Sequence, residues 1–266
     1  MTALEPREAG AFMQRLGPAI EAAFGRPKAI VAVSAHSLAR EPVLLAAAQH
    51  QAVYDFSGLD KRLTSLRYDA PGAPELAQRV AALLEGAGIA VHSVNEGGLD
   101  HGIWTPLRFM FPGADVPVLP LAWPAYWSPA RLLALGAALS PLAEQGVLVM
   151  GTGSLTHNLG RVFGSGQSPQ ADAPPTLESS AFRQWFAERG AAADWPALLD
   201  YRRQAPHAVL MHPSDEHLLP FFVAAGAAGP KPHALRIHES VVLGDLAMDA
   251  FAFGPAAAQL AAALRH

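Results

Sequence analysis

The sequence predicts an α/β fold, a single domain whose mostly parallel or mixed central sheet is flanked by helices. Short apolar, β-branched runs alternate along the chain with stretches of helical periodicity, which is the pattern of a parallel sheet covered on both faces. The 266 residues fit one large domain, and no linker divides them. With 51% hydrophobic and 16% charged residues, the chain can bury a substantial core.

The first half of the chain supplies most of the expected elements. Apolar residues at helical spacing predict a first helix that ends near Gly25, with Gly17-Pro18 as a kink or break. The run Ala29–Ser34 is short and β-branched and predicts a buried strand. We also expect helices over 74–85 and 129–144 and strands over 89–94, 116–121 and 146–150. The strand over 116–121 is the weakest of these, because Pro117 and Pro120 each remove a hydrogen-bond donor.

The second half is less regular. Helices are expected over 177–190 and 195–203, and one or two strands within 240–254. Ser214 is predicted to cap a helix that begins at Asp215 and carries His217 in its first turn, since acidic residues are favourable at the positive end of a helix. The segment Gly164–Pro175, rich in Gly, Ser, Gln and Pro, is expected to be a loop and a candidate lid.

Composition excludes several classes of function. The net charge of −4, without a basic stripe, argues against nucleic acid as a partner. The longest apolar stretches fall short of the roughly 18 residues that a membrane span needs, and the N-terminus lacks the layout of a secretory signal. We therefore expect a soluble, cytoplasmic protein. There are no cysteines, so any metal must be held by His, Asp or Glu, which suits zinc, iron or harder ions.

Histidines are the residues that could carry chemistry. Of the eleven, five lie at the ends of predicted elements: His36, His101, His157, His212 and His217. In an open α/β sheet, ligands bind beyond the carboxyl ends of strands, where His36 and His157 are expected. A lone loop histidine is more often structural than functional, and position alone gives His36, His157 and His217 about even odds. Their spacing matches no local metal motif.

Other catalytic motifs fail on inspection. Gly151–Thr156 is not a dinucleotide fingerprint, because its third glycine position is Thr156. It is not a nucleophile elbow either, since Ser154 has threonines where glycines are needed. Hydride transfer, nucleotide hydrolysis and serine acyl transfer are therefore disfavoured.

Six blocks of sequence carry a resemblance to a known family. In order, they are Ile30–Ser37 (IVAVSAHS), Tyr54–Gly58 (YDFSG), Tyr68–Gly72 (YDAPG), Leu99–Leu107 (LDHGIWTPL), Gly151–Leu159 (GTGSLTHNL) and His212–Pro220 (HPSDEHLLP). Together they resemble the class III extradiol ring-cleaving dioxygenases. The resemblance is to the DOPA 4,5-dioxygenase-like branch, which is related to the catalytic subunit of protocatechuate 4,5-dioxygenase. It runs from about residue 1 to Gly254.

The resemblance implies a mononuclear non-haem metal site that opens a small catecholic aromatic ring with O2. By motif, His36 and His217 would be metal ligands, His157 the acid/base residue, and His101 a histidine that contacts or orients the substrate. Fe(II) is the metal implied for active members, and zinc is the alternative, because it has a similar preference for imidazole. The catechol oxygens and O2 must share the metal, so the protein would supply only about three ligands.

Three departures from the family pattern bear on this expectation. Family members carry a His-Gly-Ser-Pro-Met segment near the start, and its histidine, the third ligand, would precede Met1 together with a first strand. We therefore expect residues 1–266 to form one extradiol-dioxygenase-like catalytic domain that lacks its N-terminal first strand, with a partly occupied or empty metal site. Tyr54 stands where histidine is usual, and Ser37 stands where a bulky aromatic is common, so both would alter the substrate pocket.

Two rival functions stay open at this point. One is a non-catalytic or metal-poor protein of the same fold that binds a ligand or a partner protein, and the other is a metal-assisted hydrolase. The sequence also leaves open which catechol is the substrate, which bond is cut, and whether the chain forms a homo-oligomer.

Overall fold

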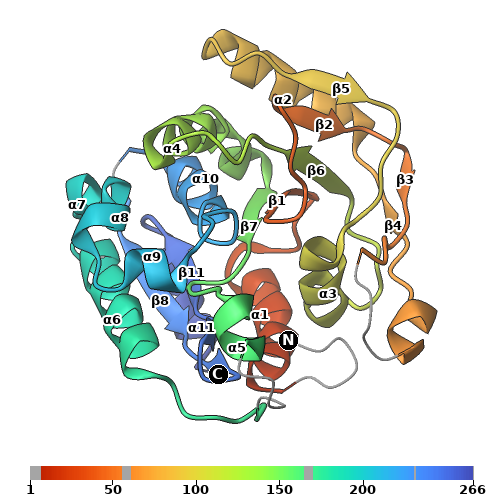
Figure 1. Cartoon of the computed structure of the whole chain (residues 1–266). Coiled ribbons are helices and arrows are strands. Elements are labelled where there is room, and N and C mark those ends of the chain that lie inside the picture. Colours follow the sequence, from red (N-terminus) through yellow and green to blue (C-terminus); the bar gives the residue numbers. More distant parts are fainter. Residues whose placement is uncertain (1–6, 56–60, 165–169, 231, 266) are drawn as a thin grey trace.

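Five strands form the central sheet, in the order β5–β2–β6–β1–β7 (Figure 1). The computed structural model describes residues 7–55, 61–164, 170–230 and 232–265. The strands are β5 (His92–Val94), β2 (Val43–Leu45), β6 (Val118–Ala122), β1 (Ala29–Ser34) and β7 (Val147–Thr152). All neighbours run parallel except β2 and β6, which are antiparallel. The predicted α/β fold with a mostly parallel or mixed sheet is confirmed.

Strand β1 is the most protected element of the sheet. All six of its residues are buried, and it pairs with β6 on one side and β7 on the other. Burial on both faces explains its continuous apolar run. Strand β6 lies inside the sheet although Pro120 is part of it and Pro117 directly precedes it. A proline has no N–H to donate, but its carbonyl can still accept a hydrogen bond, and the carbonyl of Pro117 accepts one from Ile30 N at 2.8 Å.

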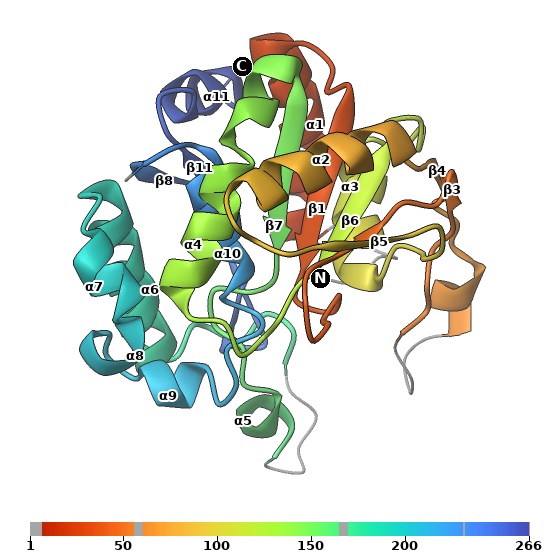
Figure 2. The same ribbon diagram turned by 90° about the horizontal axis from the view of Figure 1, so that it is seen from above.

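Helices cover both faces of this sheet (Figure 2). On one face α1 (Glu8–Phe24) and α3 (His101–Met110) pack against alternate residues of β1, and α2 (Pro74–Gly86), α4 (Pro129–Ala138) and α10 (Pro220–Ala227) cover the other. Helix α1 is not split, since Pro18 lies within it. A Cβ on Gly17 would stand 2.0 Å from Met110 O, so glycine is what lets α1 approach α3 this closely.

The remaining elements of the described chain are short, except for the 15-residue helix α6. They are β3 (Gln49–His50), η1 (Lys61–Ser65), β4 (Ala70–Pro71), η2 (Ser140–Gln145), α5 (Leu159–Phe163), α6 (Leu177–Ala191), α7 (Trp195–Leu199), α8 (Tyr201–Gln204), α9 (Ala208–Met211), β8 (Ala234–His238), β9 (Val241–Val242), β10 (Leu246–Ala247), β11 (Ala250–Phe253) and α11 (Ala257–Ala263). The helix predicted over 129–144 divides into α4 and η2, and the one over 195–203 into α7 and α8. The tail forms three short strands, one more than expected.

The predicted helix start at Asp215 is wrong. Helix α10 begins at Pro220, and turns precede it, with Ser214 Oγ donating to the Glu216 carboxylate at 3.0 Å rather than capping a backbone N–H. The carbonyl of His217 accepts from Ser154 N at 2.9 Å, and Phe221 N turns instead to Leu218 O at 3.1 Å. In a helix the His217 carbonyl would accept from Phe221 N, but here it accepts from Ser154 N of a distant loop instead.

Two further expectations concern the loop around residue 170 and the absence of a membrane span. The predicted loop Gly164–Pro175 lies partly outside it, and residues 170–175 have no regular secondary structure. Among the helices of the described residues, none is long and apolar enough to cross a membrane.

Candidate active site

His36 lies just beyond the carboxyl end of β1, an inner strand of the central sheet. Its backbone N–H donates to Ser34 Oγ at 3.1 Å, and the carbonyl of Ser34 accepts from the indole N–H of the buried Trp123 at 2.7 Å. The chain therefore leaves β1 in a turn that is fixed from two directions. This is the end of an α/β sheet at which ligands bind.

A buried carboxylate joins this turn to helix α3. Asp100 caps α3: its Oδ1 accepts from Gly102 N at 2.8 Å and from Ser34 Oγ at 2.7 Å, while Oδ2 accepts from Ser37 Oγ. A Cβ on Gly102 would stand 2.4 Å from Ser34 Oγ, so a larger residue would push the helix away. The cap thus draws the start of α3 against the end of β1.

As a result, His101 lies beside His36. His101 is the first residue of α3, and its ring centroid is 4.0 Å from that of His36. Its Nδ1 lies 2.8 Å from Asp55 Oδ1. Asp55 belongs to a sequence block that carried the resemblance, yet sequence reasoning missed its role, because no spacing links it to a residue 46 positions away.

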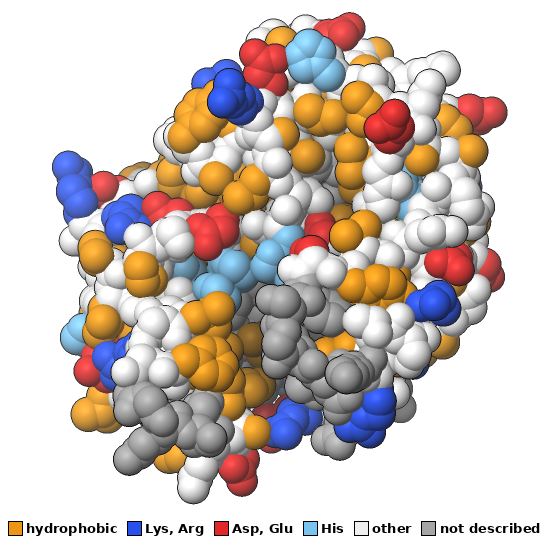
Figure 3. Space-filling view, turned by 45° about the vertical axis from the view of Figure 1, so that its right-hand side comes forward, with side chains coloured by type: hydrophobic (Ala, Val, Ile, Leu, Met, Phe, Trp, Pro, Cys, Tyr) orange, Lys and Arg blue, Asp and Glu red, His pale blue; other side chains and the backbone are white. Residues whose placement is uncertain are grey.

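The other two predicted histidines complete a row. The rings of His157 and His217 stack with centroids 3.4 Å apart and planes at 8°, and the His217 ring lies 5.1 Å from that of His36. The order along the row is therefore His101, His36, His217, His157. Figure 3 shows histidine side chains gathered in a hollow on one face of the molecule, with acidic side chains beside them.

Close backbone approach holds the two halves of the row together. A Cβ on Gly153 would stand 2.0 Å from His217 O, and one on Gly151 would stand 2.4 Å from Pro220 O. His157 N donates to Met211 O at 2.9 Å. Gly151 and Gly153, which do not form a dinucleotide-binding motif, are therefore needed for the close packing of this loop against the turn before α10 and the first residue of that helix.

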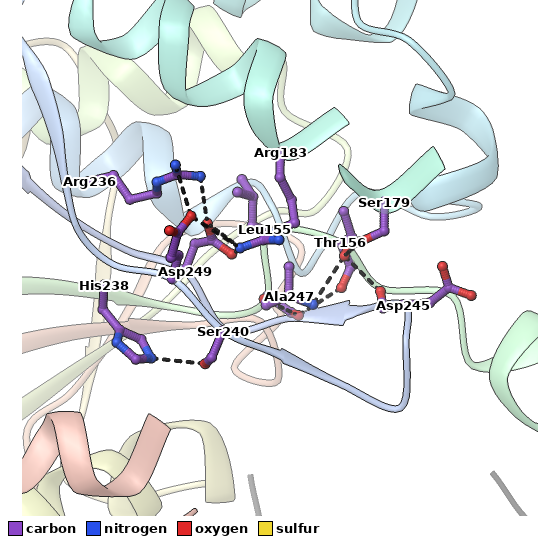
Figure 4. Close-up of polar contacts among 12 residues, drawn as sticks. Leu155, Thr156, Ser179, Arg183, Arg236, His238, Ser240, Asp245, Ala247 and Asp249 are labelled. Carbon is purple, nitrogen blue, oxygen red and sulfur yellow. Dashed lines mark hydrogen bonds and ion pairs between the residues drawn. The ribbon is translucent and has the colours of Figure 1, made fainter. Parts of the chain in front are cut away.

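A polar network behind the row anchors the loop that carries His157 (Figure 4). The buried Thr156 donates through Oγ1 to Asp245 O at 2.7 Å and accepts from Ala247 N at 3.1 Å. Nearby, Arg183 of α6 donates to the fully buried Asp249 carboxylate at 2.8 Å, and Arg236 of β8 lies 3.3 Å from it. This ion cluster joins α6 to β8 and to Asp249, which lies between β10 and β11, and so supports β10, the strand to which Thr156 is bonded.

Electrostatics favour neutral imidazoles at three positions of the row, His36, His157 and His217. Burial, and secondarily the neighbouring histidines, lower the pKa of His157 to about 4 and also lower the pKa values of His36 and His217. The Glu216 carboxylate lies 3.3 Å from His217 Nδ1. Neutral imidazoles keep a lone pair at neutral pH, which is what a divalent metal requires of a histidine ligand.

Donor atoms suited to a metal ion form two groups in the described chain. One comprises His36, Asp55 and His101, and the other His157, Glu216 and His217, with the ligand atoms of each group within 4.8 Å of one another. Imidazole and carboxylate together suit non-haem iron or zinc. The two ligands predicted from the sequence, His36 and His217, belong to different groups, and the donor chemistry of both groups fits the metal that the sequence resemblance implies.

Other residues singled out in the sequence have structural roles. His212 is fully buried, and its Nε2 lies 2.8 Å from Leu155 O, so it supports the His157 loop rather than joining the row. The hydroxyl of Tyr54 donates to Leu66 O and accepts from Arg67 at 2.6 Å, and the Ser37 hydroxyl is bonded to Asp100.

Comparisons with known proteins identify the family of this chain. Residues 5–244 match the family model described as the catalytic LigB subunit of aromatic ring-opening dioxygenase. The chain is 37% identical to "4,5-DOPA dioxygenase extradiol" of Beta vulgaris over 81% of its length and 78% of that protein. It is 32% identical to the protein of the same name in Escherichia coli K12, over 84% and 81%.

A solved structure extends this likeness to three dimensions. The crystal structure of an uncharacterized protein from Escherichia coli K12 superposes with a TM-score of 0.69 at 27% identity, covering 89% of this chain and 90% of that one. Family match, sequence identity and fold point the same way. The chain belongs to the LigB family of aromatic ring-opening dioxygenases, in the DOPA-dioxygenase-like branch of the class III extradiol enzymes.

Proposed function

We propose that this chain is a non-haem metal-dependent extradiol dioxygenase that opens the ring of a small catecholic aromatic with O2. The observation that carries the proposal is the row of four histidines at the carboxyl end of the central sheet. The relatives named as 4,5-DOPA dioxygenases support the same reaction class. We also propose that residues 1–266 act as one catalytic domain, because helices from both halves of the chain cover one sheet.

Within this function we assign the metal to His36 and His217, with Fe(II) as the expected ion and zinc as the alternative. Their ring centroids lie 5.1 Å apart, and the ring planes meet at 83°. A bound metal of this kind supplies open coordination positions for the catechol oxygens and O2.

Proton handling is assigned to His157, with His101 as the second histidine that contacts the substrate. The lowered pKa of His157 keeps its imidazole neutral before substrate binds, so it can accept a proton from a catechol hydroxyl. Because His157 stacks on His217, this acceptor lies next to the assigned metal position without being needed as a ligand.

Replacing His157 tests the assignment. In His157→Ala, oxygen uptake with a panel of catechols in the presence of Fe(II) should vanish, while bound metal measured by elemental analysis stays at the level of the parent protein. His92→Ala is a matched control, because His92 is an exposed histidine paired with Glu41. Loss of metal in His157→Ala would mean that the roles of ligand and base are exchanged. A metal-loaded parent protein that consumes no oxygen with any catechol would refute the enzymatic function and favour a binding protein of the same fold.

A further inference from the structure

One carboxylate oxygen holds His101 at two points. Asp55 Oδ1 accepts from the backbone N–H of His101 at 3.1 Å and lies 2.8 Å from its ring Nδ1. An ionised carboxylate can only accept hydrogen bonds, so the hydrogen of this contact must be on Nδ1. Burial alone would raise the pKa of Asp55, but its hydrogen bonds with His101 outweigh that effect and the pKa is lowered. Asp55 is therefore ionised at neutral pH.

The backbone around Asp55 fixes this contact. Leu99 N donates to Gln51 O at 2.9 Å, and Val53 N donates to Leu99 O at 2.8 Å, so the segment before Asp55 runs parallel to the segment before His101. The indole N–H of the buried Trp104, on α3 itself, donates to Val53 O at 3.1 Å. Three bonds thus hold the segment that leads to Asp55 against the start of the helix that begins with His101.

We propose that Asp55 is a positioning residue that fixes the Nδ1–H tautomer of His101 and thereby makes Nε2 the acceptor atom of that ring. The tautomer of a neutral imidazole is set by the hydrogen bond at its other nitrogen. With Nδ1 held by Asp55, His101 can accept a hydrogen bond from a hydroxyl group through Nε2 but cannot donate one there. This role rests on the proposed function: His101 Nε2 accepts a hydrogen bond from the hydroxyl of a catechol that binds beside His36.

Nitrogen-15 NMR of the histidine rings tests the proposal directly. Spectra are recorded above the ordinary histidine pKa, without metal or substrate, and the His101 signals are assigned by their absence in His101→Gln. In the parent protein, His101 should carry its proton on Nδ1. In Asp55→Ala it should shift toward the Nε2–H form. In Asp55→Asn it should stay on Nδ1, because the amide oxygen can accept the same two bonds.

A matched control comes from the other acid–histidine pair at the surface. Glu41 Oε2 lies 2.7 Å from His92 Nε2, so Glu41→Gln should leave the His101 signals unchanged. With the loaded enzyme, kcat/KM should fall about 10- to 100-fold in Asp55→Ala and less in Asp55→Asn, by analogy with the range typical when the hydrogen-bond partner of a metal-ligating histidine is removed.

Two results would overturn the proposal. One is a parent protein whose His101 carries its proton on Nε2, a measurement that needs no variant to fold. The other is a folded Asp55→Ala protein, judged by its circular dichroism, whose His101 keeps the Nδ1–H form. Absence of oxygen uptake in the parent protein would refute the dioxygenase function alone, because the tautomer is measured without the reaction.

Discussion

The Asp100 cap is the contact whose removal should disturb the site most for the smallest change in sequence. In Asp100→Ala, helix α3 loses a side-chain cap, which costs about 0.5–2 kcal/mol. The buried Ser34 hydroxyl loses its acceptor, at a further cost of about 1–3 kcal/mol. Because the two effects share one carboxylate, we expect a combined loss of about 2–4 kcal/mol in the free energy of unfolding.

Asp100→Asn separates hydrogen bonding from charge. The amide oxygen can still accept from Gly102 N and Ser34 Oγ, and the amide nitrogen can donate to the Ser37 hydroxyl. Its cost should therefore stay near 1 kcal/mol, the net value of an ordinary hydrogen bond. Urea unfolding at pH 7 measures both variants against the parent protein. An Asp100→Ala protein as stable as the parent would refute the reasoning, and an Asn variant as unstable as the Ala variant would assign the effect to charge.

Two other perturbations follow from the packing and the charge state of the row. Gly153→Ala would place a Cβ 2.0 Å from the His217 carbonyl, so it should cost about 1–3 kcal/mol in urea unfolding and lower bound metal. Gly86→Ala is the control: a Cβ there meets nothing within 4 Å and alanine favours the helix, so neither the stability nor the bound metal should fall. Acid should also destabilise the fold, because the pKa of His157 is lowered to about 4 and the unfolded chain takes up its proton first, near pH 6.5. The free energy of unfolding should fall between about pH 6.5 and 4, less steeply in His157→Gln; an equal pH dependence in the two proteins would contradict this.

Local sequence patterns predicted the parts of the fold that depend on short-range chemistry. The run Ala29–Ser34 is apolar because both faces of β1 are buried, so its assignment needed no tertiary information. Residues 214–219 show the opposite case. Their acids and serine are typical of a helix start, but the bond from Ser154 to the His217 carbonyl comes from a distant loop and keeps the segment in turns. Strand β6 lies inside the sheet for a similar reason, since its neighbours on both sides are set by the whole topology.

The site was predictable as a set of residues but not as an arrangement. Family-like blocks identified His36, His101, His157 and His217, and the structure brings their rings into one row. The order within the row, and the partnership of Asp55 with His101, depend on which chain segments meet at the end of the sheet. Sequence spacing carries no information on such contacts, which join residues 46 to 181 positions apart.

The two-sided pairing of β1 has a consequence for motion at the site. Backbone amides of a buried strand paired on both edges exchange with solvent only when the whole domain unfolds, whereas a short surface segment opens locally at far lower free energy. His36 follows the first kind of element, whereas Asp55 belongs to the second kind, a largely exposed segment held by a few bonds. Amide hydrogen exchange should therefore be slowest in β1, which leads into His36, and faster over residues 51–55, although the bonds to Leu99 and Trp104 keep Asp55 beside His101 in the folded protein.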